Sequence, residues 1–169
     1  MISTKLFQYD NFPNINGDRI SLRQILDKDI PELVEISFYD AIQAETVEQA
    51  AEMQSKINTD YINGNSIHWA IVDHATDKIV GTCGYYRGFN KGEGELGCVL
   101  LPQYKGKGYM TDAMLLAIDF GLHQIGLKRI WAATSQQNTK AIQLLERLGF
   151  KKIADLDDNE IEFELSQKS

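Results

Sequence analysis

The stretch from Gly97 to Asp112 constrains the fold more than any other part of the sequence. It predicts a strand, a turn bounded by Pro102, a loop with Gly106 and Gly108, and then a helix. A helix start leaves about four backbone N–H groups without partners and carries a partial positive charge. Glycines let such a backbone approach a ligand closely. With the added charge of Lys105 and Lys107, the amides of Lys107 to Thr111 are predicted to form a phosphate cradle.

Two common phosphate motifs do not explain this loop. A P-loop needs Ser or Thr after Gly-Lys, and here Gly108 follows Gly106-Lys107. The glycines at 92, 94 and 97 have the spacing of a dinucleotide fingerprint. That segment enters a strand rather than a strand-to-helix turn, and it contains Glu93 and Glu95, so we interpret the match as coincidental.

Composition indicates one ordinary globular domain, residues 1–169, with an irregular segment at 1–17. Hydrophobic residues make up 43% of the 169, and the net charge of −7 argues against a nucleic-acid partner. The sequence has no apolar run long enough for a membrane and no signal-peptide pattern at its start, so we expect a cytoplasmic protein. Cys83 and Cys98 are expected to be free thiols, and the three scattered histidines predict no metal site.

Periodicity and capping residues predict an α+β fold, with a mixed, mostly antiparallel, seven-stranded sheet and about four flanking helices. The expected strands cover residues 19–25, 66–73, 78–86, 92–101, 127–135, 150–155 and 160–165. The expected helices cover residues 27–38, 46–62, 106–125 and 138–148.

Over residues 17 to 165 the sequence resembles the GCN5-related N-acetyltransferases (GNAT), and within them the RimJ/RimL-like branch that acetylates ribosomal-protein N-termini. The acetyl-CoA signature of that family falls on Lys105-Gly-Lys-Gly108-Tyr-Met110. Arg19 to Arg23 resembles the opening strand of the branch, and Asn138-x-x-Ala141 with Glu146 to Phe150 resembles its fourth motif.

The resemblance implies a GNAT fold and direct acetyl transfer from acetyl-CoA, with no metal, to a primary amine. The amine is a protein N-terminal α-amine or a small amine. Two parallel strands would splay apart, and pantetheine would bind the backbone of Val99 and Leu100 in the gap. The Leu100 N–H would serve as the oxyanion donor. The remaining cofactor contacts would come from Lys105, Gly106, Lys107, Gly108, Tyr109, Met110, Thr111 and Asn138.

Glu95 is our candidate for the base that takes the proton of the amine, because many members of the family place a carboxylate there. The alternative is a solvated edge-strand glutamate beside Glu93. Asn138 is also a natural helix cap. Leu145 and Ala141 replace the residues that protonate the departing thiolate in other members.

The acceptor side is less defined. Phe38 and Tyr39, at the end of the first expected helix, could line an acceptor groove, whereas His68 is expected in the core or at its rim. Many members of the family form homodimers, and the sequence specifies no interface. Two alternatives remain at this stage: a non-catalytic acetyl-CoA-binding or regulatory module, and a binding module without a CoA site.

Overall fold

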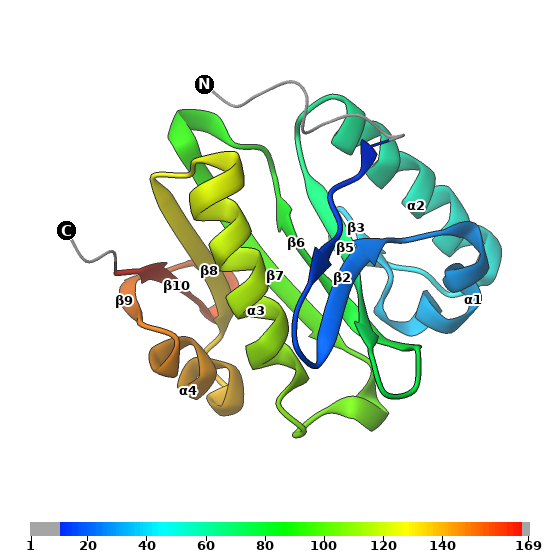
Figure 1. Ribbon diagram of the computed structural model, residues 1–169. Helices are drawn as coiled ribbons and strands as arrows, with labels where there is room; N and C mark the ends of the chain where they lie inside the picture. Colours follow the sequence, from blue (N-terminus) through cyan, green and yellow to red (C-terminus); the bar gives the residue numbers. More distant parts are fainter. Residues whose placement is uncertain (1–10, 167–169) are drawn as a thin grey trace.

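The protein is built on a twisted eight-stranded sheet that carries helices on both faces (Figure 1). We describe it from a computed structural model, which covers residues 11–166. The strands lie in the order β1-β2-β5-β6-β7-β8-β10-β9. Their bounds are β1 Ile15–Asn16, β2 Ile20–Gln24, β5 Ile67–Asp73, β6 Lys78–Tyr86, β7 Glu93–Leu100, β8 Arg129–Ser135, β9 Phe150–Asp155 and β10 Glu160–Leu165.

All neighbouring strands pair antiparallel except β7 and β8, which confirms the mixed, mostly antiparallel sheet. The expected count of seven strands is too low. The additional strand in the sheet, β1, lies within the segment expected to be irregular; the first ten residues of that segment lie outside the described residues. A separate hairpin of β3 Phe38–Tyr39 and β4 Ile42–Gln43 was also not predicted.

About four helices were expected, and residues 11–166 contain four α-helices: α1 Ile30–Leu33, α2 Val47–Ile62, α3 Tyr109–Phe120 and α4 Thr139–Arg147. Figure 1 shows α3 lying across the near face of the sheet. There its apolar side packs on Trp69 and Ile71 of β5, while Ala70 and Val72 of the same strand face the other way, towards Leu33 of α1. Among residues 11–166, no helix is both long and apolar enough to cross a membrane.

Two of the helices begin at the capping residues that the sequence indicated. The Thr46 hydroxyl accepts a hydrogen bond from the Gln49 amide at 3.1 Å, and the Asn138 side chain accepts one from the Ala141 amide at 3.2 Å. The first expected helix is much shorter than 27–38. Short 3₁₀ turns flank the four residues of α1, and Phe38 and Tyr39 belong to a strand rather than to a helix end.

The parallel strands β7 and β8 pair only at one end. Their register contains three pairs, from Glu93 opposite Arg129 to Glu95 opposite Trp131, and ends there. Leu96 to Leu100 therefore have β6 on one side and no strand partner on the other. This confirms the predicted splay of the two strands.

We call the diverging strands β7 and β8 the fork, with its closed end at the three paired residues. Arg129 stabilises this closed end. Its guanidinium donates to Glu93 of β7 at 2.8 Å and also to Glu162 and Glu164 of β10. The side chain is only 25% exposed, so the three carboxylates depend on it for much of their charge compensation. A single arginine thus joins three adjacent strands where the fork begins.

We predict that Arg129→Met lowers the free energy of unfolding by about 2 kcal/mol, between the values for surface and buried ion pairs, because three carboxylates lose their shared partner. Urea denaturation followed by circular dichroism measures the loss. The control is Lys152→Met, which removes an exposed ion pair to Asp155 at 2.9 Å and should change stability by less than about 0.5 kcal/mol. Equal effects of the two substitutions would contradict the role given to Arg129.

Candidate functional site

The loop before α3 has the shape of an anion cradle. Gly106 and Gly108 have φ values of +77° and +85°, in the left-handed region that favours glycine. The first helical hydrogen bond runs from the Asp112 amide to the Gly108 carbonyl at 3.2 Å, and no side chain caps this end of α3. The amides of Tyr109, Met110 and Thr111 precede that bond and are available to an anion.

The left-handed glycines also explain why the helix begins three residues later than expected. Residues 106 to 108 form the turn that aims the helix start outwards, and α3 begins at Tyr109. A Cβ at Gly106 would meet nothing within 4 Å, so the space above the loop is open.

Three cations surround the cradle. Lys105 and Lys107 are exposed on the loop, as expected. The third is Arg19, whose guanidinium lies 4.0 Å from the centre of the Tyr109 ring and 3.3 Å from the Asp112 carboxylate. Arg19 was noted only as part of a strand motif, because its place beside the loop depends on the packing of β2 against α3.

The backbone of β7 directs alternate residues into the gap beside β8. The Leu101 amide donates to Val80 of β6 at 2.9 Å, so by strand alternation the Leu100 and Cys98 amides point away from β6 and into the gap. The Val99 carbonyl lies on the β6 side, where a Cβ added to Gly81 would be 2.3 Å from it. The N–H of Leu100 therefore points into the gap, as expected. The N–H and C=O of Val99 both point towards β6, which differs from the expected contact of the Val99 backbone with pantetheine.

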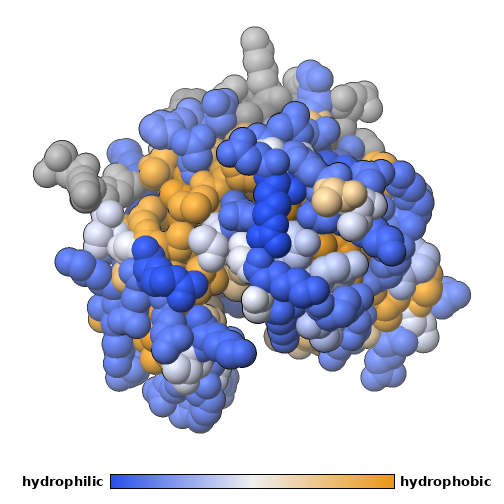
Figure 2. Space-filling model, turned by 60° about the horizontal axis from the view of Figure 1, so that its bottom comes forward, coloured by the Kyte–Doolittle hydropathy of each residue, from blue (hydrophilic) through white to orange (hydrophobic). Residues whose placement is uncertain are grey.

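Figure 2 brings the bottom of Figure 1 forward, the end at which α3 begins, and shows this face hollowed by a notch. Strand β7 ends at Leu100, at the open end of the fork. The turn that leads into the glycine loop begins at Pro102, directly after it in the sequence. A ligand with a diphosphate at one end and an extended arm could thus lie on α3 with its arm between β7 and β8.

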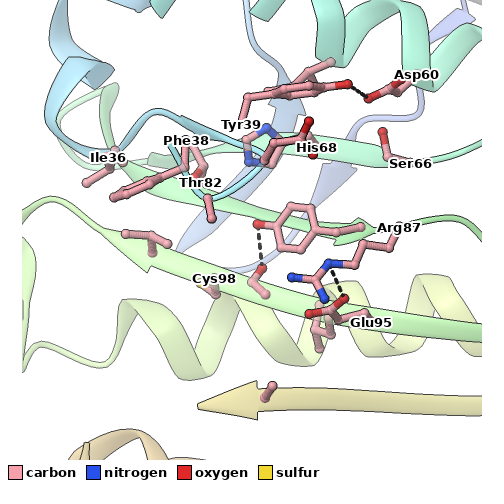
Figure 3. A pocket seen from close by; sticks show the side chains of 18 of the residues that line it. Ile36, Phe38, Tyr39, Asp60, Ser66, His68, Thr82, Arg87, Glu95 and Cys98 are labelled. Carbon is pink, nitrogen blue, oxygen red and sulfur yellow. Dashed lines mark hydrogen bonds and ion pairs between the residues drawn. The ribbon is translucent and has the colours of Figure 1, made fainter. Parts of the chain in front are cut away.

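A cavity of about 980 Å³ adjoins β7. Its lining residues come from α2 and from β3, β5, β6, β7, β8 and β10, and Figure 3 shows side chains that meet across it. The charged lining residues are Asp40, Asp60, Glu95, Glu160 and Arg87, so acidic groups predominate.

Glu95 lies in this cavity rather than in solvent. Its side chain is 12% exposed, and Arg87 Nε lies 3.3 Å from its Oε1, the contact drawn in Figure 3. Burial raises the pKa of the Glu95 carboxyl above its ordinary value; Arg87 opposes the rise, and Glu160 and Glu162 add to it. The Arg87 contact lacks the geometry of a hydrogen bond, so Oε1 is buried without a hydrogen-bond partner.

His68 of β5 is the second unsatisfied polar group in the cavity. Its ring meets Tyr86 edge-on, with 5.6 Å between ring centres, and burial lowers the pKa of the imidazole to about 4. The ring is therefore neutral at pH 7, and its buried Nδ1 has no hydrogen-bond partner. Of the three such side-chain atoms among residues 11–166, two belong to residues that line this one cavity.

The β3–β4 hairpin forms another wall. Phe38 and Tyr39 line the cavity as expected, although from a strand, and the Tyr39 hydroxyl donates to Asp60 of α2 at 2.8 Å. Asp40 and Ala41 make the two-residue turn with φ values of 51° and 65°. The neighbouring tyrosines of β6 divide between the two faces: Tyr86 lines the cavity, and Tyr85 is buried, donating to the Ala117 carbonyl of α3 at 2.6 Å.

Comparison with known proteins shows what this arrangement is. The model of the acetyltransferase (GNAT) domain matches residues 19–151. This chain belongs to the GNAT acetyltransferase family. It has the GNAT fold and is an acetyl-CoA-dependent N-acetyltransferase.

Two curated relatives carry the same general activity in their names. The chain is 28% identical to the uncharacterized N-acetyltransferase YoaA of Bacillus subtilis over 149 residues, 83% of this chain and 84% of that one. It is 35% identical to the uncharacterized N-acetyltransferase p20 of Bacillus licheniformis over 115 residues, 68% of this chain and 65% of that one.

Two solved structures show the same fold at low identity. The ribosomal-protein-S5-alanine acetyltransferase of Vibrio fischeri superimposes with a TM-score of 0.72 at 21% identity, covering 90% of this chain and 95% of its own. The dodecameric spermidine N-acetyltransferase of Vibrio cholerae gives 0.73 at 17%, covering 88% and 92%.

We predict that Gly108→Asp weakens acetyl-CoA binding roughly fivefold or more, because like charges about 4 Å apart repel by at least about 1 kcal/mol. Asp tolerates the left-handed conformation better than most residues, which limits the damage to the loop. Isothermal titration calorimetry measures the dissociation constant.

The matched control for Gly108→Asp is Gly126→Asp. Gly126 also has a left-handed φ, +82°, but it follows the far end of α3. A Cβ there would meet nothing within 4 Å, whereas one at Gly108 would lie 3.2 Å from the flexible guanidinium of Arg19. The control variant should carry a similar cost in stability and bind acetyl-CoA normally. If both variants bind acetyl-CoA as the unchanged protein does, the diphosphate does not lie on this loop.

Proposed function

We propose that this enzyme transfers an acetyl group from acetyl-CoA to the primary amine of a small cationic acceptor, which binds in the cavity beside β7. The observation that carries this proposal is the pair of buried, unsatisfied polar atoms, Glu95 Oε1 and His68 Nδ1, which belong to two residues that line a single acidic cavity. An amine supplies N–H donors, the partner that both atoms lack.

The donor would lie along the gap in the sheet. The amides from Lys107 to Thr111 receive the diphosphate, and Lys105, Lys107 and Arg19 balance its charge. The gap-facing backbone of Leu100 and Cys98 receives the pantetheine arm, and Asn138 caps α4 on the opposite side of the fork. The bound acetyl-CoA supplies the activated thioester, and the protein supplies its placement.

Leu100 and Cys98 are both candidates for the N–H that stabilises the charge developing on the thioester carbonyl. Along an extended strand they lie about 17 Å and about 10 Å from Glu95, respectively. The shorter separation favours Cys98 for the carbonyl, with Leu100 holding the pantetheine. Even about 10 Å exceeds a direct proton transfer, so the ammonium would give its proton to Glu95 where it first binds, and the neutral amine would then move to the thioester.

Glu95 would act as the base. Ammonium groups are mostly protonated at pH 7, and attack needs the neutral amine. A carboxylate whose pKa is raised by burial is a better proton acceptor than an exposed one. The neutral His68 would accept a second N–H hydrogen bond and orient the nitrogen.

The bonds and protons of the transfer then balance without a separate acidic residue to protonate the thiolate. The N–C bond forms, the C–S bond breaks, and the surplus proton of the amine reaches the departing thiolate. This route suits a chain in which Leu145 is buried among apolar residues and the Ala141 amide is occupied by the helix cap. The RimJ/RimL-like assignment, a protein N-terminus as acceptor, a homodimer and a cytoplasmic location remain predictions from the sequence.

The test of the proposed acceptor is CoA release from acetyl-CoA, measured with a thiol reagent, over a panel of amines. The panel holds spermidine, simple alkyl diamines, free lysine, and peptides that begin with Ala or Ser. We expect the small cationic amines to be acetylated fastest, because the cavity is lined mainly by carboxylates. Turnover of the peptides alone would show that the acceptor is a protein N-terminus.

For the role of Glu95, we predict that Glu95→Gln lowers turnover roughly a hundredfold at pH 7 and distinctly less at pH 9. At pH 9 a larger share of the amine is already neutral, so the base matters less. Steady-state rates at saturating acetyl-CoA give the comparison.

The control for this substitution is Glu52→Gln, which changes an exposed carboxylate on α2 that does not line the cavity and should keep normal rates at both pH values. A loss in Glu95→Gln that is the same at pH 7 and pH 9 would mean that Glu95 supports the structure and does not take the proton.

A further inference from the structure

Arg87 has an unusual position for a residue that neutralises a buried carboxylate. It directly follows β6, its φ is +62°, and its side chain is 77% exposed. Its Nε nevertheless reaches to 3.3 Å from Oε1 of Glu95, whose side chain is 12% exposed. The guanidinium thus reaches from a largely exposed side chain to a buried carboxylate, and Figure 3 draws this contact.

The contact with Arg87 compensates the charge of Glu95 but does not give the carboxylate a hydrogen bond. Glu95 Oε1 has no hydrogen-bond partner although Arg87 is close, because the approach lacks hydrogen-bond geometry. A guanidinium that served to anchor Glu95 would be expected to bind it through two parallel hydrogen bonds. Arg23 does this elsewhere in the protein, donating to both oxygens of Asp29 at 2.7 and 3.0 Å.

No other cation balances Glu95 among the groups that act on it. Glu160 and Glu162 from β10 add negative charge, and Arg129 is already shared by Glu93, Glu162 and Glu164. His68 of β5 is neutral near pH 7, and burial keeps the Tyr86 hydroxyl of β6 protonated. Arg87 is the one cation lining the cavity within residues 11–166.

We propose that Arg87 is a positioning residue whose guanidinium occupies the place of the acceptor ammonium in the free enzyme and leaves it when the acceptor binds. The inference rests on the proposed role of Glu95. While Arg87 is in place, it favours the ionised form of the carboxylate. When an ammonium replaces it, one cation exchanges for another, and the incoming cation can give its proton to Glu95, which an arginine does not do.

This exchange makes Arg87 a competitor for cationic acceptors. An acceptor without a positive charge could not replace the guanidinium on Glu95, so the residue selects for amines that arrive protonated. Because the side chain is mostly exposed, releasing it into water is expected to cost little, in the range of surface ion pairs.

The first experiment needs no acceptor. The ¹³C carboxyl signals of glutamate-labelled protein are titrated by NMR, and Glu95→Gln identifies the signal of Glu95. In Arg87→Met we expect Glu95 to titrate at higher pH than in the unchanged protein, because the cation that favours its ionised form is gone. Arg87→Lys should restore part of the difference.

The second experiment follows kinetics with the amine that is acetylated fastest in the panel. Arg87→Met should lower its KM by about two- to fivefold at pH 9, since a surface-type ion pair no longer competes. The acidic limb of kcat/KM should move to higher pH, and the KM for acetyl-CoA should stay unchanged. The control Lys91→Met removes an exposed cation from the same β6–β7 connection and should alter none of these values.

The outcomes separate this inference from the proposed function. If Glu95→Gln loses turnover at pH 7 while Arg87→Met leaves the Glu95 titration and the amine KM unchanged, Arg87 has no such role and Glu95 remains the base. An amine KM that rises in Arg87→Met would also overturn the inference, because Arg87 would then bind the acceptor. If Glu95→Gln keeps normal turnover, Glu95 is not the base, and the proposed function is contradicted. The inference about Arg87 then falls with it, whatever the titration of Glu95 in Arg87→Met shows.

Discussion

The separation of β7 from β8 after Glu95 is the constraint on which the site depends. A strand inside a sheet normally has partners on both sides, and Leu96 to Leu100 lack one on the β8 side. Unsatisfied backbone groups in such a position are costly unless a ligand or water fills them. Arg129 fixes the closed end of the fork and the glycine loop begins just beyond its open end, so the same divergence provides both the channel and its entrance.

Much of the fold was predictable because it rests on local signals. The helix caps at Thr46 and Asn138 and the bounds of β6, β9 and β10 agree with the sequence pattern. The β3–β4 hairpin gave no such signal. Its turn places Asp40 and Ala41 in the left-handed region where glycine or asparagine is usual, so the segment reads as the end of a helix. The two residues of β1 are too few to show any alternation.

The two halves of the site differ in how far the sequence discloses them. The donor half is made mainly of backbone within one contiguous stretch, and its glycines and lysines can be read in order. The proposed acceptor half consists of side chains from seven strands and helices that lie far apart in the sequence, so their meeting is a property of the sheet and not of any motif. Glu95 shows the limit: its position suggested a base, but only the packed cavity distinguishes it from an exposed edge glutamate. Arg87 and Asp60 carry no local signal at all.

This division also accounts for how one fold serves different acceptors. The neighbours with TM-scores of 0.72 and 0.73 are named for ribosomal alanine and for spermidine, although both share the arrangement of this sheet. Backbone amides can hold the same donor through many changes of side chain, since each substitution leaves the N–H groups in place. The cavity has no such protection: replacing Asp60, Arg87 or Glu160 changes its charge directly without disturbing the fork. Under the proposed function, selection on the acceptor can therefore act on the walls contributed by β3, α2 and the β6–β7 connection, while the splay proposed to position the thioester stays fixed by Arg129 and the loop.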